Sequence, residues 1–217
     1  MSLSDQIIEF QKSFLTSVPQ EVLAKMMKAT EDLAATGIAE RAPKVGDTLA
    51  EFSLPNQTGA TVTLSDLTAK GPVIITFYRG GWCPYCNLEL KAYQSVLDEI
   101  NQAGATLVAI TPELPDTSLS TIEKNEIEFQ VLSDVNADYA KQLGVVFSLA
   151  DELRPIYDQF GIELEKYNGE GQFDLPLAAT FVVDEQGVIV SAFVDADYTK
   201  RQEPAEALAA VKSLATA

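Results

Sequence analysis

Apolar runs typical of buried strands alternate with helix-like segments along most of this 217-residue chain. The clearest run, Val73–Tyr78, ends shortly before a pair of glycines and a segment with apolar residues at helical spacing. Further strand-like runs follow at Thr106–Thr111, Phe129–Leu132 and Val188–Val194. Because strands that alternate with helices build sheets with parallel portions, the sequence predicts an α/β fold.

The N-terminal segment has a different pattern, with two helical stripes of apolar residues separated at Pro19. The stripes consist of Ile7, Phe10, Phe14 and Val18, then Val22, Leu23, Met26, Met27 and Leu33. Such stripes cover an apolar surface, either on the neighbouring domain or on a second copy in a homodimer. We therefore divide the chain into an N-terminal helical extension, residues 1–42, and a main domain, residues 43–217.

One stretch, Ser148–Asp174, interrupts the alternation of strands and helices. It contains a short helical piece, followed by the polar, glycine-bearing segment Tyr167–Gln172. Long connections in compact domains are more often functional than structureless. The stretch is therefore interpreted as an insertion or lid near the end of the sheet.

The net charge of −17 excludes the basic patch that nucleic acids need, and it disfavours an anionic membrane surface. No apolar run reaches membrane-spanning length. The first residues also lack the basic start and apolar stretch of a secretory signal. A cytoplasmic protein without nucleic-acid or membrane partners is expected.

The chain has no histidine and only two cysteines. The missing imidazole excludes a histidine-assisted nucleophile and the histidine-containing zinc sites. Two cysteines alone supply only half of a zinc ligand set, and we expect neither a metal nor another cofactor.

The cysteines Cys83 and Cys86 lie where a buried strand leads into a helix with Pro84 in its first turn. The unpaired N–H groups and positive dipole at a helix start stabilise a thiolate. Cysteine pKa values at such positions fall from about 8.5 to roughly 3.5–7.5. The pair can also close a disulfide, so one thiol is a candidate nucleophile and the other its resolving partner. The simpler alternative is two small buried residues without chemistry.

Two neighbours of the cysteines bear on this chemistry. Arg79, four residues before Cys83, either adds a fixed positive charge near the thiolate or forms a surface salt bridge. Trp82 is expected to pack beside the thiols rather than to contact substrate.

The segment Trp82–Cys86 resembles the thioredoxin-type redox motif, in which the first cysteine attacks. The wider frame, Phe77–Cys86, resembles peroxiredoxins of the alkyl-hydroperoxide-reductase and thiol-specific-antioxidant family. Those proteins carry Phe-Tyr-Pro, then a threonine, and the peroxidatic cysteine three residues later. In this register Cys86 takes the peroxidatic position and Cys83 replaces the threonine. The resemblance covers about Val45–Pro204 and is closest to the subgroup with a CxxC pair.

Three residues depart from the family pattern: Arg79 replaces the proline, Cys83 the threonine and Ala178 an arginine before the Thr-Phe strand. In the family those residues orient peroxide and stabilise the thiolate, so we expect peroxide reduction that is slow by the family's standard. Pro176 resembles, two residues out of register, the cis-proline that faces the cysteines in thioredoxin folds.

The resemblance implies a thioredoxin-like three-layer sandwich with a central mixed sheet. It also implies an antioxidant-type oxidoreductase that cycles Cys83 and Cys86 between dithiol and disulfide, with Arg79 as a third site residue. The implied partners are a peroxide or a protein disulfide, and an external reductant of the thioredoxin or glutathione type.

Three mechanisms fit these residues. In a peroxidase, the Cys86 thiolate attacks peroxide to form a sulfenic acid, and Cys83 condenses with it. In a protein disulfide reductase, Cys83 attacks and Cys86 resolves the mixed disulfide. The third is a non-catalytic interaction module with the cysteines as a redox-sensing latch. The main domain carries the whole cysteine motif, so we expect the N-terminal helices to be dispensable for the redox site but to matter for stability or association.

Overall fold

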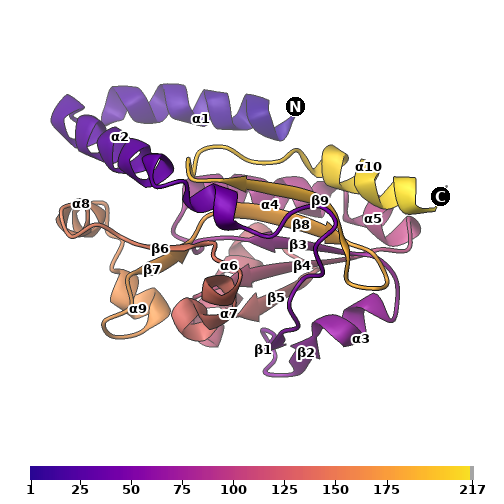
Figure 1. The fold of residues 1–217 in the computed structure, drawn as a ribbon. Coiled ribbons are helices and arrows are strands. Elements are labelled where there is room, and N and C mark those ends of the chain that lie inside the picture. The colour runs from indigo at the N-terminus through magenta and orange to yellow at the C-terminus, as the bar shows by residue number, and fades with distance from the viewer. Residues whose placement is uncertain (216–217) are drawn as a thin grey trace.

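The computed structural model describes residues 1–215 and has the mixed α/β fold that the sequence predicts (Figure 1). The central sheet has the strand order β5-β4-β3-β8-β9. Its strands are β3 (Val73–Phe77), β4 (Thr106–Thr111), β5 (Gln130–Ser133), β8 (Ala178–Val183) and β9 (Ile189–Asp195). The pairs β3–β4 and β4–β5 are parallel, whereas β3–β8 and β8–β9 are antiparallel. The sheet is therefore mixed.

Helices surround this sheet, and two separate two-stranded sheets accompany it. The α-helices are α1 (Leu3–Ser17), α2 (Gln20–Ala35), α3 (Leu64–Thr68), α4 (Pro84–Ser95), α5 (Leu97–Gln102), α6 (Pro115–Asn125), α7 (Asp138–Gln142), α8 (Arg154–Gln159), α9 (Leu164–Asn168) and α10 (Pro204–Leu214). Short 3-10 turns are η1 (Ile38–Arg41) and η2 (Val135–Ala137). The paired short strands are β1 (Ser53–Pro55) with β2 (Thr61–Thr63), and β6 (Val146–Ser148) with β7 (Asp174–Pro176).

The alternation of side chains along β3 divides the core into two layers. Ile75 and Phe77 join one buried cluster, together with Phe52 before β1 and Tyr139 of α7. Ile74 faces the opposite cluster, which contains the buried side chains of α4, α5 and α10. The sheet is thus enclosed on both faces, as expected for a three-layer sandwich. Both cysteines belong to the second cluster.

The two predicted N-terminal helices are present as α1 and α2, and Figure 1 shows them as an antiparallel pair set apart from the sheet. A capping box between Ser2 and Asp5 begins α1. The Phe10 ring of α1 meets Tyr85 of the cysteine-bearing helix edge-on, with ring centroids 5.2 Å apart. The aromatic stripe of the extension therefore packs directly on the cysteine-bearing helix.

Leu88, Ala92, Val96 and Ile100 have the spacing of one helix that starts at Pro84 and predict a continuous helix, but the structure has two helices, α4 and α5, which meet at Val96. The Val96 N–H bonds the Tyr93 carbonyl three residues back, and the Ser95 hydroxyl donates to the Ala92 carbonyl. Such local bonds compete with the regular helical ladder, which explains the break.

The interrupting stretch Ser148–Asp174 forms an excursion that contains α8 and α9. The pairing of β6 with β7 closes its base, and Val146 lies opposite Pro176. No described peptide bond is cis, so the comparison of Pro176 with a cis-proline is wrong. Here the proline is an ordinary residue of a two-stranded ribbon.

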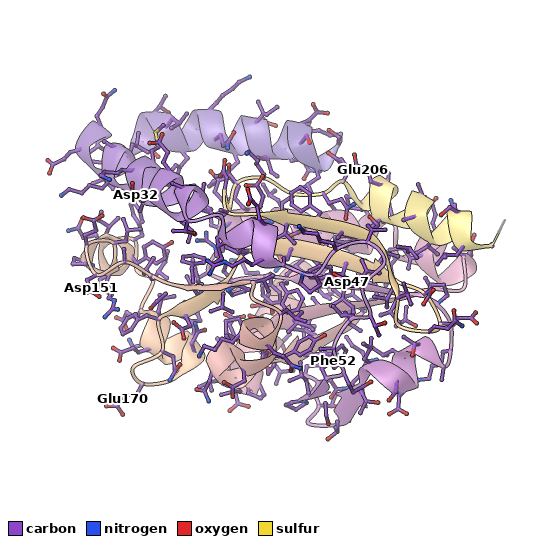
Figure 2. All side chains as sticks on the ribbon, viewed as in Figure 1. Asp32, Asp47, Phe52, Asp151, Glu170 and Glu206 are labelled. Atoms are coloured by element: carbon purple, nitrogen blue, oxygen red, sulfur yellow. The ribbon has the colours of Figure 1, made fainter. Side chains whose placement is uncertain are left out.

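The acidic surface is distributed over the molecule. Figure 2 shows the labelled Asp32, Asp151, Glu170 and Glu206 on separate parts of the chain, whereas Phe52 is buried. Within residues 1–215, no helix combines the length and the apolar character needed to cross a bilayer.

Candidate functional site: a buried thiol pair between two arginines

A tight backbone turn joins β3 to α4 and positions the cysteines. A Cβ atom added to Gly81 would overlap the Thr121 hydroxyl, and one added to Gly80 would overlap the Trp82 indole. Gly80 also has a φ of 151°, a backbone conformation that residues other than glycine rarely adopt. The glycine pair therefore lets the chain pass close to α6 before the helix begins.

The thiols stand at the start of α4, as the motif predicts. Cys83 is the N-cap residue and Cys86 lies in the first turn, after Pro84. Both cysteines are free thiols and both are 0% exposed. A substrate must therefore reach sulfur atoms that the surrounding side chains cover.

Arg79 is buried beside the first thiol, which excludes the surface salt-bridge interpretation. Its Nη2 donates to Cys83 Sγ at 3.1 Å and its Nη1 to the Tyr157 hydroxyl at 3.1 Å. The guanidinium also lies 4.1 Å from the ring centroid of Tyr198. Among the ion pairs of the described residues none involves Arg79, so its charge acts chiefly on Cys83.

A second arginine, Arg201, contacts the other thiol. Its side chain is 1% exposed, and its Nη2 donates to Cys86 Sγ at 3.5 Å. Its Nε forms an ion pair with Glu89 at 2.7 Å, and Glu89 also accepts a 3.3 Å hydrogen bond from Thr76. Sequence reasoning missed Arg201 because no motif surrounds it. This chain carries Ala178 where the family has an arginine. Arg201 nonetheless supplies a guanidinium group beside the thiols.

The two thiols have opposite pKa shifts. Although burial alone raises a thiol pKa, the hydrogen bond from Cys86 and the charge of Arg79 hold the pKa of Cys83 well below its ordinary value. Burial and the neighbouring Cys83 raise the pKa of Cys86 well above it. The charges around the pair favour a lower pKa for Cys83 than for Cys86, because Glu89 neutralises Arg201 whereas no carboxylate among the described residues pairs with Arg79. The geometry therefore supports a thiolate on Cys83 and a proton on Cys86.

Two buried carboxyl groups flank the pair. Burial raises the pKa of both Glu89 and Glu113 to about 7. Glu113 accepts hydrogen bonds from the Gly81 N–H at 3.0 Å and from the Tyr78 hydroxyl at 3.4 Å. It therefore fixes the turn that carries Arg79 and Cys83. Trp82 packs beside the thiols, 5.6 Å from the Tyr157 ring, as expected.

Among residues 1–215, no group of three or more histidine, cysteine, aspartate or glutamate side chains is arranged to hold a metal ion. The chemistry available to the described site is that of two thiols, two guanidinium groups and two carboxyls.

Two proteins named as putative peroxiredoxins are similar to this chain in sequence. A putative peroxiredoxin of Mycobacterium tuberculosis is 33% identical over 113 residues, which are 52% of this chain and 73% of that protein. A putative peroxiredoxin Bcp of Coxiella burnetii is 30% identical over 146 residues, which are 67% of this chain and 85% of that protein.

Solved structures of two such proteins have a fold similar to that of this chain. Peroxidoxin BcpB of Mycobacterium tuberculosis is 25% identical, with a TM-score of 0.62, over 79% of this chain and 97% of that one. Peroxiredoxin 6 of Arenicola marina is only 14% identical but has a TM-score of 0.64, over 80% of this chain and 74% of that one. These likenesses confirm the thioredoxin-like fold.

The sequence model of the AhpC/TSA family matches residues 45–192, a range that contains both cysteines and Arg79. Together with the peroxiredoxin relatives, that match shows that this chain belongs to the AhpC/TSA family and is a peroxiredoxin-like, thiol-dependent oxidoreductase.

Proposed function

We propose that this protein reduces peroxides with Cys83 as the first nucleophile and Cys86 as the resolving thiol. The observation that carries the proposal is the 3.1 Å contact between the buried guanidinium of Arg79 and Cys83 Sγ. A thiolate, rather than a thiol, is the reactive form of cysteine. Arg79 favours the thiolate on Cys83, while Cys86 keeps its proton.

In the first step the Cys83 thiolate attacks the terminal peroxide oxygen. A sulfur–oxygen bond forms, the oxygen–oxygen bond breaks, and the departing oxygen takes up a proton to leave as an alcohol or water. Cys83 is thereby oxidised to a sulfenic acid. The guanidinium of Arg79 lies beside the oxygen atoms that gain negative charge.

In the second step the sulfur of Cys86 attacks the Cys83 sulfenic acid. A disulfide forms, and the hydroxyl group leaves with the Cys86 proton as water. Arg201, 3.5 Å from Cys86 Sγ, stabilises the charge that Cys86 develops as it loses that proton. An external dithiol of the thioredoxin type, or two thiols of the glutathione type, then restores both cysteines by thiol–disulfide exchange.

The order of the two cysteines is the point on which sequence and geometry differ. The peroxiredoxin register makes Cys86 the attacking residue, whereas the thioredoxin-like segment Trp82–Cys86 and the contact with Arg79 favour Cys83. The same Cys83 thiolate also suits attack on a protein disulfide, which is the second candidate function.

Trapping of sulfenic acid in single variants tests this order. With peroxide and a dimedone-type probe, Cys86→Ser is expected to accumulate labelled Cys83, whereas Cys83→Ser labels weakly and the double variant not at all. The opposite labelling would make Cys86 the nucleophile. If neither variant is labelled but the wild type reduces a model protein disulfide, the disulfide reductase becomes the better description.

We further propose a homodimer that uses the N-terminal helices, because Ile8, Leu15 and Met27 are exposed on α1 and α2. Light scattering during gel filtration tests it, and a monomer at micromolar concentration contradicts it. A cytoplasmic location is also proposed, in keeping with the two free thiols. Cell fractionation tests that location.

A further inference from the structure

The guanidinium group of Arg79 lies between aromatic rings. It is 4.1 Å from the ring centroid of Tyr198 and 5.1 Å from that of Trp82, and the residue is only 4% exposed. Aromatic faces attract a cation, and because that attraction acts on the charge as a whole, it depends little on how the planar group is turned. The two rings therefore hold the charge of Arg79 without choosing which of its nitrogen atoms faces Cys83.

Hydrogen bonds make that choice. Within the described residues, the Arg79 side chain donates to Cys83 Sγ through Nη2 and to the Tyr157 hydroxyl through Nη1, each at 3.1 Å. Because a guanidinium is a rigid planar fork, two hydrogen bonds define its orientation. Without the hydroxyl, Nη1 would be a buried donor lacking a partner, as Nε already is. The group would then turn toward other acceptors and loosen its contact with the thiol.

The position of Tyr157 is itself fixed by packing. The residue comes from the interrupting stretch Ser148–Asp174 and is 78 residues from Arg79 in sequence. It lies in α8, where its N–H bonds the Leu153 carbonyl at 3.0 Å and its carbonyl accepts from the Ile162 N–H at 2.9 Å. Its side chain is buried in the apolar cluster of this stretch. The hydroxyl that reaches Arg79 is therefore held by a packed element and not by a mobile surface side chain.

We propose that Tyr157 is a positioning residue of the redox site, whose hydroxyl orients Arg79 so that Nη2 stays on Cys83 Sγ. The proposal rests on the proposed function, because it concerns the nucleophile named there. The interrupting stretch then serves the site by supplying this hydroxyl. The charge of Arg79 helps to hold the pKa of Cys83 low, so a loss of orientation raises that pKa.

The test is a titration of Cys83 in the full-length chain. Tyr157→Phe removes the hydroxyl and keeps the ring. In a Cys86→Ser background, the ultraviolet absorbance of the thiolate reports Cys83 alone and needs no probe to reach the buried sulfur. We expect the midpoint to rise by about one pH unit, which is the scale of one hydrogen bond to a charged group. Tyr167→Phe is the matched control, because it makes the same change in α9 at a hydroxyl that takes no part in the hydrogen bonds of Arg79.

A double-mutant cycle with Arg79→Gln separates positioning from a direct effect. If Tyr157 acts through Arg79, Tyr157→Phe moves the midpoint when the arginine is present and much less when it is replaced. An equal rise in both backgrounds would mean that the hydroxyl acts on Cys83 directly, and it would overturn the positioning role. The other charged and titratable groups around Cys83 are the same in all these variants: Arg201, Glu89, Glu113, Tyr85 and Tyr198.

An unchanged midpoint in Tyr157→Phe also overturns the proposal. With both cysteines present and at a pH below both midpoints, Tyr157→Phe should react with hydrogen peroxide about tenfold more slowly than the wild type, in proportion to its thiolate fraction. A wild type that is inert toward peroxide refutes the proposed function, but the titration still decides the role of Tyr157. Should Tyr157→Phe unfold, Tyr157→Met removes the hydroxyl with an adaptable apolar side chain and is read in the same way.

Discussion

Two buried arginines give two neighbouring sulfur atoms different environments. Arg79 has no carboxylate partner among the described residues and contacts Cys83, whereas Arg201 is shared between Cys86 and Glu89. The sequence predicted the first arginine, because it stands four residues from the thiol in the same turn. It could not predict the second, which is 115 residues from Cys86 and belongs to no motif. Contacts of that kind depend on the tertiary fold.

The role of Arg201 can be tested through the second chemical step. Arg201→Gln removes the charge beside Cys86, and we expect disulfide formation from the Cys83 sulfenic acid to slow by roughly tenfold to hundredfold. In a Cys83→Ser background the same change is expected to shift Cys86 alkylation to higher pH. Arg201→Lys should restore part of the rate of disulfide formation and part of the wild-type alkylation profile. Lys200→Gln is the control, since Lys200 is exposed and pairs with Asp195. Unchanged alkylation profiles would contradict the role.

Glu113 is expected to make stability depend on pH. Its pKa is about 7 in the folded protein, against an ordinary value of 4.5, so the folded state holds a proton that the unfolded state has lost between those pH values. The unfolding free energy of the wild type therefore falls as pH rises through that window. Glu113→Gln removes this contribution. Its unfolding free energy, relative to that of the wild type, should therefore rise by up to about 3 kcal/mol between pH 4.5 and 8.

Urea unfolding of both proteins at pH 4.5, 6 and 8 provides the measurement. Glu89 is common to both, so its own titration cancels in the difference. A constant difference across the three pH values would show that Glu113 titrates normally.

At the scale of elements, the sequence predicted the strands β3, β4, β5 and β9 of the central sheet and the start of the cysteine-bearing helix, because apolar runs and Pro84 are strong local signals. It missed α3 for a local reason. The strand-like run Thr61–Leu64 is a strand only as far as Thr63, because the Thr63 side chain accepts a hydrogen bond from the Asp66 N–H and so caps a helix that begins at Leu64. It also missed the break at Val96, where side-chain and backbone bonds replace the helical ladder.

The turn between β3 and α4 is sensitive to a small substitution. Gly81→Ala forces the new Cβ against the Thr121 hydroxyl of α6, and overpacking of this kind costs about 1–3 kcal/mol. Thr121→Ala removes the overlapping oxygen and should recover part of that loss in the double variant. A double-mutant cycle by chemical denaturation measures the coupling. If the two substitutions change the unfolding free energy additively, the turn relaxes without touching α6.

At the scale of the molecule, the site is completed by both ends of the chain. The family match at 45–192 supplies the thiols and Arg79, while Arg201 follows it and α1, whose Phe10 packs on Tyr85, precedes it. The sequence identified the extension 1–42 as helical but not its position, because an amphipathic stripe does not reveal which surface it covers. We retain 1–42 and 43–217 as the proposed division. The contacts show that the two parts share a site.

One ionic contact joins the two ends and offers a way to loosen α1. The Glu203 carboxylate accepts hydrogen bonds from the backbone N–H groups of Leu3 at 3.1 Å and Ser4 at 2.7 Å, at the positive end of α1. Although partial burial opposes it, these bonds lower the pKa of Glu203. The anchor is therefore present above the ordinary pKa of glutamate and is lost as pH falls through the lowered folded value.

Both sulfur atoms are inaccessible in the closed fold, so the alkylation rate of the reduced native protein reports how often the site opens. Glu203→Gln weakens the anchor and is expected to raise that rate severalfold at neutral pH, with the far-ultraviolet spectrum unchanged. Adding Phe10→Ala, which removes the contact with Tyr85, should raise the rate further. The exposed Glu206→Gln on α10 controls for loss of one negative charge near that end of the molecule. If Glu203→Gln and Glu206→Gln react at the same rate, access to the thiols does not pass beneath α1, and another path must admit the substrate.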